Sequence, residues 1–457
     1  MLDWSRLLFV GHAFGARYDL PIPLVLFILG GAAVVFASFL LVLPRAVPLE
    51  GVSVVADRPN VRAGGLPPAV LAGLLLVLLI VAGMFGSQNV PENILPTAFW
   101  LMAWIAVPIS CGVIGDWTRS VNPFAALARV ADRPNLRRSV LAGPEVPWPS
   151  WLGWWPATVI FFVGACGELI FNATATKPVV TALGFLIYAF INVVAGLVFG
   201  SEMWLARGEM FSVLYNTWGR LGWFRFGAPG RRRFGGGLEA RFEPHVSRIT
   251  FVLLLLVSVS FDGLLATPAW KHAREHLPSA ISPGTGSYLI LTTLAFIALL
   301  LFGWALFGGF AAAVRHGGSL ESGTLVVLAG LLPSLVPIAF GYLVAHNAEY
   351  LVINGQLLFP LLGNPAGVMW WSHLAYPFND SYEININLLP SSVVWYTQVA
   401  LIVFVHVVAV ILAHDYLTRA ARTVRHARRA EWFWIVDMVA YTMSSLWLLA
   451  QPLVKGG

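Results

Sequence analysis

The chain has 457 residues, of which 58% are hydrophobic and only 11% are charged, with a mean hydropathy of +0.77. Soluble domains carry about 25% charged residues, so this composition excludes an ordinary soluble protein and predicts an all-α integral membrane protein. The net charge of +6 does not indicate a nucleic-acid partner, because the basic residues fall in short runs between apolar segments.

Ten apolar segments approach the length of about 20 residues that a helix needs to cross a bilayer. They are expected to form a single polytopic membrane domain over residues 1–457, with about ten transmembrane helices. In chain order the segments are 22–43, 68–86, 97–114, 151–171, 179–199, 249–267, 288–310, 324–345, 393–413 and 432–453.

The distribution of basic residues predicts the orientation of these helices. Of the 28 Lys and Arg residues, 22 fall in the connections that follow the first, third, fifth, seventh and ninth segments. The positive-inside rule places those connections in the cytoplasm and both termini outside, in a multi-pass protein of the bacterial inner membrane. The stretch 346–392, which has no Lys or Arg, is then an outer loop.

The longest cytoplasmic connection, 201–248, is a basic loop that begins with helical periodicity. Its aromatic and aliphatic residues alternate with charged ones at roughly helical spacing, which predicts a helix lying in the inner membrane interface. The apolar positions are Trp204, Leu205, Phe211, Leu214 and Trp218. The triple Arg at 231–233 and triple Gly at 235–237 suit a flexible loop that contacts lipid headgroups, as an anchor or as a regulatory segment.

An echo of eight residues links two other cytoplasmic connections. Residues 55–62 and 130–137 both read Val-Ala-Asp-Arg-Pro-Asn, then Val or Leu, then Arg. Such an echo is expected from a duplicated two-helix unit, since internal repeats are common in transporters. A reused turn or a chance match is the favoured explanation, because the flanking residues do not match.

Polar residues inside apolar segments are the main functional signal, because each costs about 2.5–3.5 kcal/mol to insert at a helix centre. The outer half of the membrane is expected to hold a group that lines a cavity open to the outside. Its members are Glu168, Asp262, His346, Glu349 and Gln398. His406 lies deeper, Asp437 lies in the tenth segment, and the pair His414-Asp415 belongs to the cytoplasmic rim.

Carboxylates beside imidazoles support two kinds of chemistry. They can bind a divalent metal and activate a water for hydrolysis, or they can load and release a proton or cation during transport. Hydrogen bonding between neighbouring helices is the structural alternative. The chain has no Walker A loop, no Rossmann glycine pattern, no Gly-x-Ser-x-Gly and no His-Glu-x-x-His. Pro108, Pro333 and Pro337 inside apolar segments predict kinks of the kind that shape cavities or gates.

Several stretches together carry a resemblance to one family. They are 11–23 (Gly-His-Ala-Phe-Gly-Ala-Arg-Tyr-Asp-Leu-Pro-Ile-Pro), 116–124 (Asp-Trp-Thr-Arg-Ser-Val-Asn-Pro-Phe), 261–270, 345–356 and 406–415. The chain resembles the bacterial multi-pass membrane proteins commonly labelled fenitrothion hydrolase, which implies hydrolysis of an organophosphorus triester. The titratable or amide residues in these stretches that we take as candidates are His12, Asp19, Asp262, His346, Gln356, His406 and His414.

The sequence thus yields two overlapping sets of candidates. The catalytic candidates are Asp262, His346 and Glu168, and the candidate metal ligands are His346, His406, Asp262 and His12. A divalent metal ion is the only cofactor considered. The expected partners are membrane lipid and a small-molecule substrate or ion, with no nucleic acid. Two functions stay open: hydrolysis of phosphotriesters, or a transporter, channel or membrane-complex subunit that moves protons, metal ions or a small solute.

Overall fold

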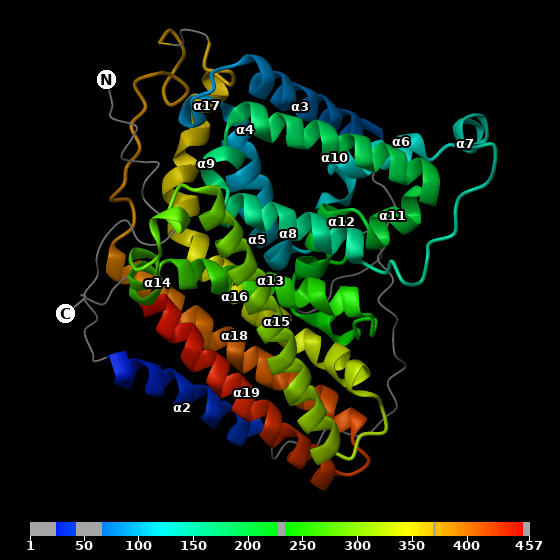
Figure 1. Cartoon of the computed structure of the whole chain (residues 1–457), viewed down its shortest axis with the longest axis vertical. Helices are drawn as coiled ribbons and strands as arrows, with labels where there is room; N and C mark the ends of the chain where they lie inside the picture. Colours follow the sequence, from blue (N-terminus) through cyan, green and yellow to red (C-terminus); the bar gives the residue numbers. More distant parts are fainter. Residues whose placement is uncertain (1–23, 43–65, 227–233, 369–371, 451–457) are drawn as a thin grey trace. The chain divides into compact units, whose positions relative to one another are not determined.

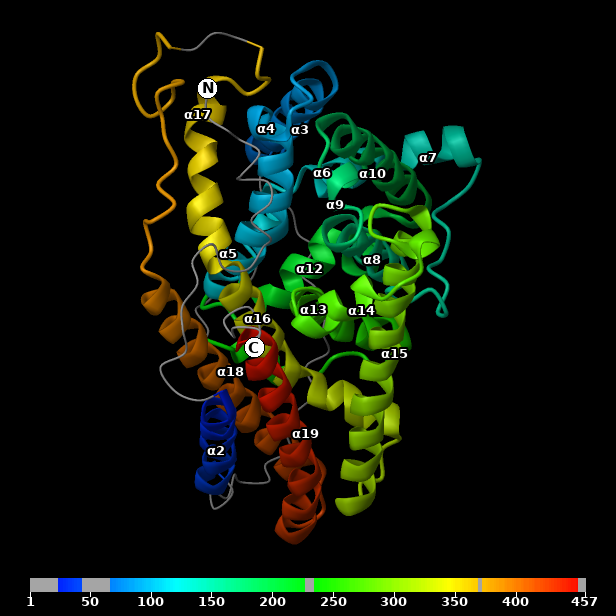
Figure 2. The same cartoon turned by 60° about the vertical axis from the view of Figure 1, so that its left-hand side comes forward.

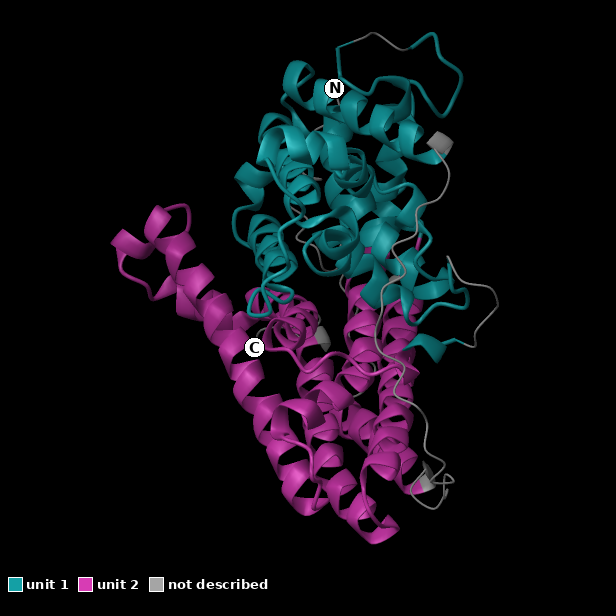
Figure 3. Cartoon of the chain, turned by 90° about the vertical axis from the view of Figure 1, so that its right-hand side faces the viewer, with its two compact units in different colours: residues 1–5, 58–237, 350–388 teal, residues 6–57, 238–349, 389–457 magenta. Residues whose placement is uncertain are grey.

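The computed structural model describes residues 24–42, 66–226, 234–368 and 372–450 (Figure 1). These residues form helices joined by loops, with no β-strand among them. Two compact units are present (Figure 3). Unit 1 comprises the described residues of 66–237 and 350–388, and unit 2 comprises 24–42, 238–349 and 389–450. The predicted single domain therefore contains two compact units. One of the boundaries between them, at residues 349 and 350, falls within the long helix α16 (Thr324–Asn354).

Each of the ten predicted segments is helical over most of its length. Seven helices are long and apolar enough to cross a membrane, which is compatible with an integral membrane protein. They are Pro68–Phe85, Ile94–Ile114, Pro178–Phe199, Val246–Leu265, Gly286–Gly317, Thr324–Gly363 and Ser392–Ala420. Two shorter apolar helices are Val25–Leu40 and Trp155–Leu169, and the tenth segment lies in α19, Val424–Ala450. The count of ten spans and the outside termini stay predictions.

Unit 1 is organised around α10, which packs against α3 and α6, while α12 packs against α5 and α8 (Figure 1). Its helices are α3 (Leu66–Phe85), α4 (Ile94–Pro96), η2 (Thr97–Ala106), α5 (Val107–Ile114), α6 (Pro123–Ala131), α7 (Pro134–Leu141), α8 (Trp155–Leu169), α9 (Asn172–Ala175), α10 (Pro178–Phe199), α11 (Ser201–Arg207), α12 (Met210–Gly219) and α17 (Leu358–Gly363), with short 3-10 turns at Val90–Glu92, Thr118–Ser120, Gly236–Glu239 and Gly355–Leu357.

The third predicted segment is a composite helix. Its middle part, Thr97–Ala106, is a π-helix, a rare conformation that proteins use mostly in short pieces and often at functional sites. Pro108 follows in the first turn of α5, where a missing N–H removes no helical hydrogen bond of that element. The irregularity that the sequence assigned to Pro108 is therefore found in the π-helical turns before it.

The start of the basic connection forms two helices instead of the predicted single one. Glu209 lies between α11 and α12 and caps the N-terminus of α12. Its carboxylate accepts hydrogen bonds from the backbone N–H of Phe211 at 3.1 Å and of Ser212 at 2.6 Å. The apolar residues that suggested an interfacial helix, such as Trp204 and Trp218, are buried within unit 1. A position of this segment at the membrane interface stays a prediction.

Unit 2 is a bundle of long helices (Figures 1 and 2). α19 lies along α2, α15, α18 and α13, and α13 also packs on α15. The helices of unit 2 are α2 (Leu24–Val42), α13 (Val246–Leu265), α14 (Pro268–Glu275), α15 (Gly286–Gly317), α16 (Thr324–Asn354, to residue 349), α18 (Ser391–Ala420) and α19 (Val424–Ala450), with a 3-10 turn at Ser279–Ile281.

α16 is the innermost helix of this bundle. Among the seven apolar helices of spanning length it has the largest buried share, 83% of its most apolar window. Glycines let it approach α18 closely: Tyr416 fills the space beside Gly330, and Val405 fills the space beside Gly341. Because the contact moves backward along α18 as it moves forward along α16, the two helices run antiparallel.

Candidate functional site

Asp262 and His346 form a close pair in unit 2. Asp262 lies in the last turn of α13, and its Oδ2 is 2.5 Å from Nε2 of His346 on α16. Their side chains are 20% and 10% exposed, so the pair is largely enclosed by the protein. Two of the three predicted catalytic residues therefore meet, although they are 84 positions apart in sequence.

A second carboxylate–histidine pair lies near the C-terminal end of α18 (Ser391–Ala420). His414 Nδ1 is 2.7 Å from Oε1 of Glu431 on α19, and the two side chains are 9% and 2% exposed. Sequence reasoning missed Glu431 because it began the tenth span at residue 432, whereas α19 begins at Val424. Asp415, by contrast, forms an ordinary i,i+4 ion pair with Arg419 at 2.6 Å.

His406 lies on α18 between the two pairs and is completely buried. Its Nδ1 is 2.7 Å from the carbonyl oxygen of Ile402. A carbonyl only accepts hydrogen bonds, so Nδ1 of the neutral ring carries the proton and Nε2 carries a lone pair. Nε2 has no hydrogen-bond partner among the described residues, and the same holds for Oδ2 of Asp437, which is 1% exposed on α19.

Tyrosine hydroxyls lie between these titratable groups. The Tyr441 hydroxyl is 2.9 Å from Oγ of Ser260, two residues before Asp262 on α13. The Tyr441 ring centroid is 6.4 Å from that of His406 and 6.4 Å from that of Tyr342. Tyr342 lies one helical turn from His346 on α16. Tyr441 thus stands between the Asp262–His346 pair and His406.

Gln398, on α18, lies beside the Asp262–His346 pair. Its Nε2 donates to the carbonyl oxygen of Ala345, the neighbour of His346, at 2.7 Å. From Gln398 to His414 the helix rises about 24 Å, against a hydrocarbon core of about 30 Å. We call this row of polar side chains the polar column. It consists of Asp262, His346, Gln398, Ser260, Tyr342, Tyr441, His406, Asp437, His414 and Glu431.

Several buried polar atoms of the column lack a hydrogen-bond partner among the described residues, as do Trp100 Nε1, Arg315 Nε and Trp434 Nε1 outside it. Buried polar atoms in proteins almost always have a protein or water partner, so each exception calls for an explanation. Five buried column atoms make no hydrogen bond within the described residues: Tyr342 Oη, Gln398 Oε1, His406 Nε2, Glu431 Oε2 and Asp437 Oδ2. Each can accept a hydrogen bond, so the column has the chemistry to hold water or a translocated ion.

The other predicted site residues lie elsewhere or outside the described chain. Glu168 belongs to unit 1, on α8, where its Oε2 accepts a hydrogen bond from Nε1 of Trp104 at 2.5 Å. Gln356, also in unit 1, binds the backbone of Asn385 through both its amide atoms, at 3.0 and 3.1 Å. Glu349 is partly buried near the end of α16. His12, Asp19, the first octet at 55–62 and the triple Arg lie outside the described residues.

The metal prediction has limited support from side-chain placement. Asp262 and His346 are close enough to share an ion, but His406 is bonded to its own helix and faces Tyr441. Among the residues that the structure describes, no group of three or more His, Cys, Asp or Glu side chains is arranged to hold a metal ion. The polar column therefore offers relay groups and only two neighbouring ligands at either end.

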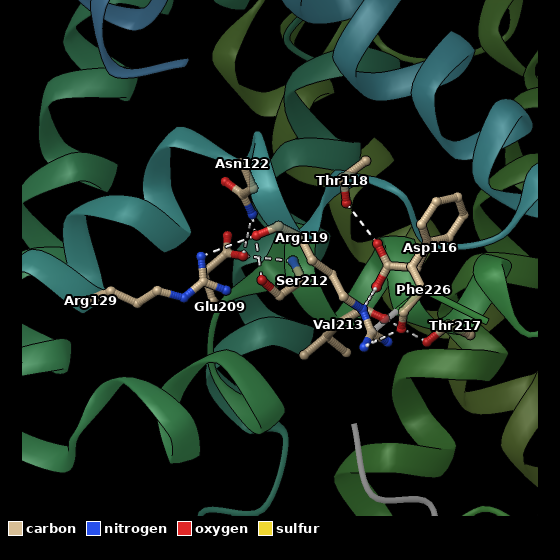
Figure 4. A network of polar contacts seen from close by, with 10 residues as sticks. All are labelled: Asp116, Thr118, Arg119, Asn122, Arg129, Glu209, Ser212, Val213, Thr217 and Phe226. Atoms are coloured by element: carbon tan, nitrogen blue, oxygen red, sulfur yellow. Dashed lines mark hydrogen bonds and ion pairs between the residues drawn. The ribbon is translucent and has the colours of Figure 1, made fainter. Parts of the chain in front are cut away.

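A second polar network, in unit 1, surrounds Glu209 and Asp116 (Figure 4). Glu209 is fully buried and accepts hydrogen bonds from Asn122 Nδ2 at 2.8 Å and from the Tyr188 hydroxyl, besides the two N–H groups that it caps. Asp116 pairs with Arg119 at 2.9 Å. Both carboxylates have several hydrogen-bond or ion-pair partners, so we interpret this network as one that holds the segment 116–124 in place.

The second octet, at 130–137, forms a further network of this kind in the same unit. Asp132 accepts hydrogen bonds from the Ser201 backbone N–H and hydroxyl, both at 2.8 Å, and pairs with Arg137. Burial raises the pKa of Asp132, but the hydrogen bonds from Ser201 and the Arg137 guanidinium outweigh it, so its pKa lies below the usual value. This octet connects α6 and α7 to the start of α11.

No protein family, no curated protein and no solved structure matches this chain. The functional argument therefore rests on the geometry of the polar column.

Proposed function

We propose that unit 2 moves protons, or a small cation, across the membrane along the polar column. The observation that carries the proposal is the set of five buried acceptors without a hydrogen-bond partner among the described residues, in a column that has a carboxylate–histidine pair at each end. Chains of Asp, Glu and His inside membrane helices are the usual material of proton relays, because such groups are too costly in lipid to be kept without a use.

The type of ion pair supports protons over permanently charged cargo. In both pairs the carboxylate lies beside a histidine and not beside a lysine or arginine. An Arg partner would stay charged at every physiological pH, whereas histidine changes charge near neutrality. A carboxylate–histidine pair can therefore take up or release one proton near neutral pH, and its net charge then changes by one unit.

The order of groups along the bundle supplies a stepwise path. Asp262 and His346 take up a proton from one side, and the hydroxyls of Ser260 and Tyr441 lead toward His406. His406 presents a basic Nε2 in the middle of the bundle. Asp437 follows on α19, and the pair His414–Glu431 releases the proton at the other end. No step needs a bound cofactor.

The membrane topology belongs to the same proposal. Ten transmembrane helices with both termini outside would place the Asp262–His346 pair on the outer side of a bacterial inner membrane. The His414–Glu431 pair would then face the cytoplasm. The charge distribution of the connections supports this orientation.

A flux assay on the whole protein tests the proposal. Purified protein is reconstituted into liposomes that contain a pH-sensitive dye, and a potassium diffusion potential drives proton entry. We expect entry well above that of protein-free liposomes, and a loss of most of it in Asp437→Asn. The matched control is Glu321→Gln, an exposed carboxylate outside the column that pairs with Arg422. Flux equal to that of empty liposomes would exclude proton translocation.

The second candidate function is hydrolysis of an organophosphorus triester, as the resemblance to the fenitrothion hydrolase family implies. It draws on the Asp262–His346 pair, in which a carboxylate beside an imidazole can act as a general base toward water. The test is release of an aryl alcohol from a phosphotriester by the purified protein, with Asp262→Asn and His346→Ala as variants. Unchanged rates in both variants would remove the pair from this chemistry.

A further inference from the structure

Helix α14, Pro268–Glu275, follows α13 in unit 2; His272 within it and His276 directly after it are two exposed histidines at helical spacing. His272 and His276 are four residues apart, so their side chains project from the same face of the helix. Their ring centroids are 4.2 Å apart, and the ring planes are tilted by 53°. Neither histidine belongs to the polar column, and the proposed proton path makes no use of them.

One backbone hydrogen bond prepares His276 as a ligand. Its Nδ1 lies 2.8 Å from the carbonyl oxygen of His272, which can only accept a hydrogen bond. In the neutral ring the proton is therefore on Nδ1, and Nε2 presents its lone pair outward. This arrangement, with one ring nitrogen donating to a carbonyl and the other available, is the usual state of a metal-binding histidine.

The charges around the pair are compatible with a cation. Glu275, three residues after His272, shares the histidine face and is exposed, with no ion pair among the described residues. Arg274 lies two residues from His272, on another face of the helix, whereas Lys271 lies four residues before Glu275 and therefore on the same side as that carboxylate. Glu275 supplies one negative charge beside the histidines, and Lys271 is the cation next to it by helical spacing.

The order His-x-x-Glu-His, residues 272–276, is also the spacing of one class of zinc motif, in which two histidines bind the metal and the glutamate serves as base. Since the described residues hold no third ligand nearby, the open coordination positions would be taken by water.

We propose that His272 and His276 form a surface site for a divalent transition-metal ion. Two imidazoles and water suit Cu²⁺, Ni²⁺ and Zn²⁺, with Cu²⁺ bound most tightly, and do not suit Mg²⁺ or Ca²⁺, which prefer oxygen ligands. The site is separate from the polar column and stands whether or not the column carries protons.

The test is a Cu²⁺ titration of the full-length protein in detergent, followed by electron paramagnetic resonance. We expect one tight equivalent whose spectrum shows nitrogen coordination, with Zn²⁺ displacing it only in large excess and Mg²⁺ leaving it in place. His272→Gln and His276→Gln should each weaken binding by about tenfold or more, because each removes one of two protein ligands. Both positions are exposed, so size-exclusion profiles should stay unchanged.

His316 provides a matched control. It is also exposed, and its Nδ1 makes the same bond to the carbonyl four residues earlier, that of Ala312, at 2.7 Å. It has no histidine four residues away on either side. His316→Gln should bind Cu²⁺ like the natural protein. Equal binding by His272→Gln, His276→Gln and the natural protein, or no bound Cu²⁺ at micromolar concentration, would overturn the proposal.

Discussion

His346 Nε2 lies 2.5 Å from Asp262 Oδ2, and this pair joins the end of α13 to the innermost helix of unit 2. If it is the entry to the polar column, Asp262→Asn should slow proton entry into proteoliposomes by at least about tenfold, since the amide cannot take up the proton. Asp415→Asn is the control, because Asp415 pairs with Arg419 outside the column. A similar loss in both variants would argue against a specific role for Asp262.

The His414–Glu431 pair, at the other end of the column, should contribute to the stability of the folded protein. In His414→Ala the buried Glu431 loses its partner, and we expect a cost of about 3–5 kcal/mol and a clear fall in the thermal unfolding midpoint in detergent. The double variant His414→Leu/Glu431→Leu removes both charges and should recover much of that loss. A double variant less stable than His414→Ala would contradict this explanation, because it would show that the cost of His414→Ala does not come from a buried Glu431 charge left without its partner.

Close packing of α16 on α18 predicts a steric effect next to His406. A Cβ atom added at Gly341 would lie 2.5 Å from Cγ2 of Val405, so Gly341→Ala should destabilise unit 2 by about 1–3 kcal/mol. At Gly308 on α15 an added Cβ meets no atom within 4 Å, and Gly308→Ala should be neutral or slightly stabilising. Thermal unfolding of both variants in the same detergent measures the difference.

Asp132 predicts a pH dependence that is separate from transport. Because its pKa in the folded protein lies below the ordinary value of 3.8, the carboxylate stabilises the fold above that pH, and this contribution is lost as the pH falls through the lowered pKa. Asp132→Asn should therefore unfold at a lower temperature than the natural protein at pH 6–7. The gap should narrow below about pH 4. A gap that stays constant with pH would show that the charge of Asp132 is not what stabilises this network.

Hydropathy predicted the helices of this chain well because lipid leaves few alternatives for an apolar segment of spanning length. It failed where polar residues continue a helix. α16 runs nine residues into the predicted outer loop, to Asn354, and α19 starts eight residues before the predicted span. Glu431 was lost from the candidate site for this reason alone.

Lateral neighbours were harder to predict than depth. Residue position along a span indicated that Glu168, Asp262 and His346 share a depth, but helix packing decides which of them meet. Asp262 contacts His346, while Glu168 bonds to Trp104 in the other unit. The spacing of Gln398, His406 and His414 did indicate a shared broad face, and each of the three meets a polar or aromatic group of α16 or α19.

The most direct measurement is the rate of voltage-driven proton entry into liposomes that contain the natural protein or His406→Gln. His406 is fully buried at the centre of the column, and glutamine keeps a polar side chain there but cannot carry the proton. The account predicts that entry falls by at least about tenfold, with unchanged folding and unchanged Cu²⁺ binding. Equal rates for the natural protein and His406→Gln would contradict it.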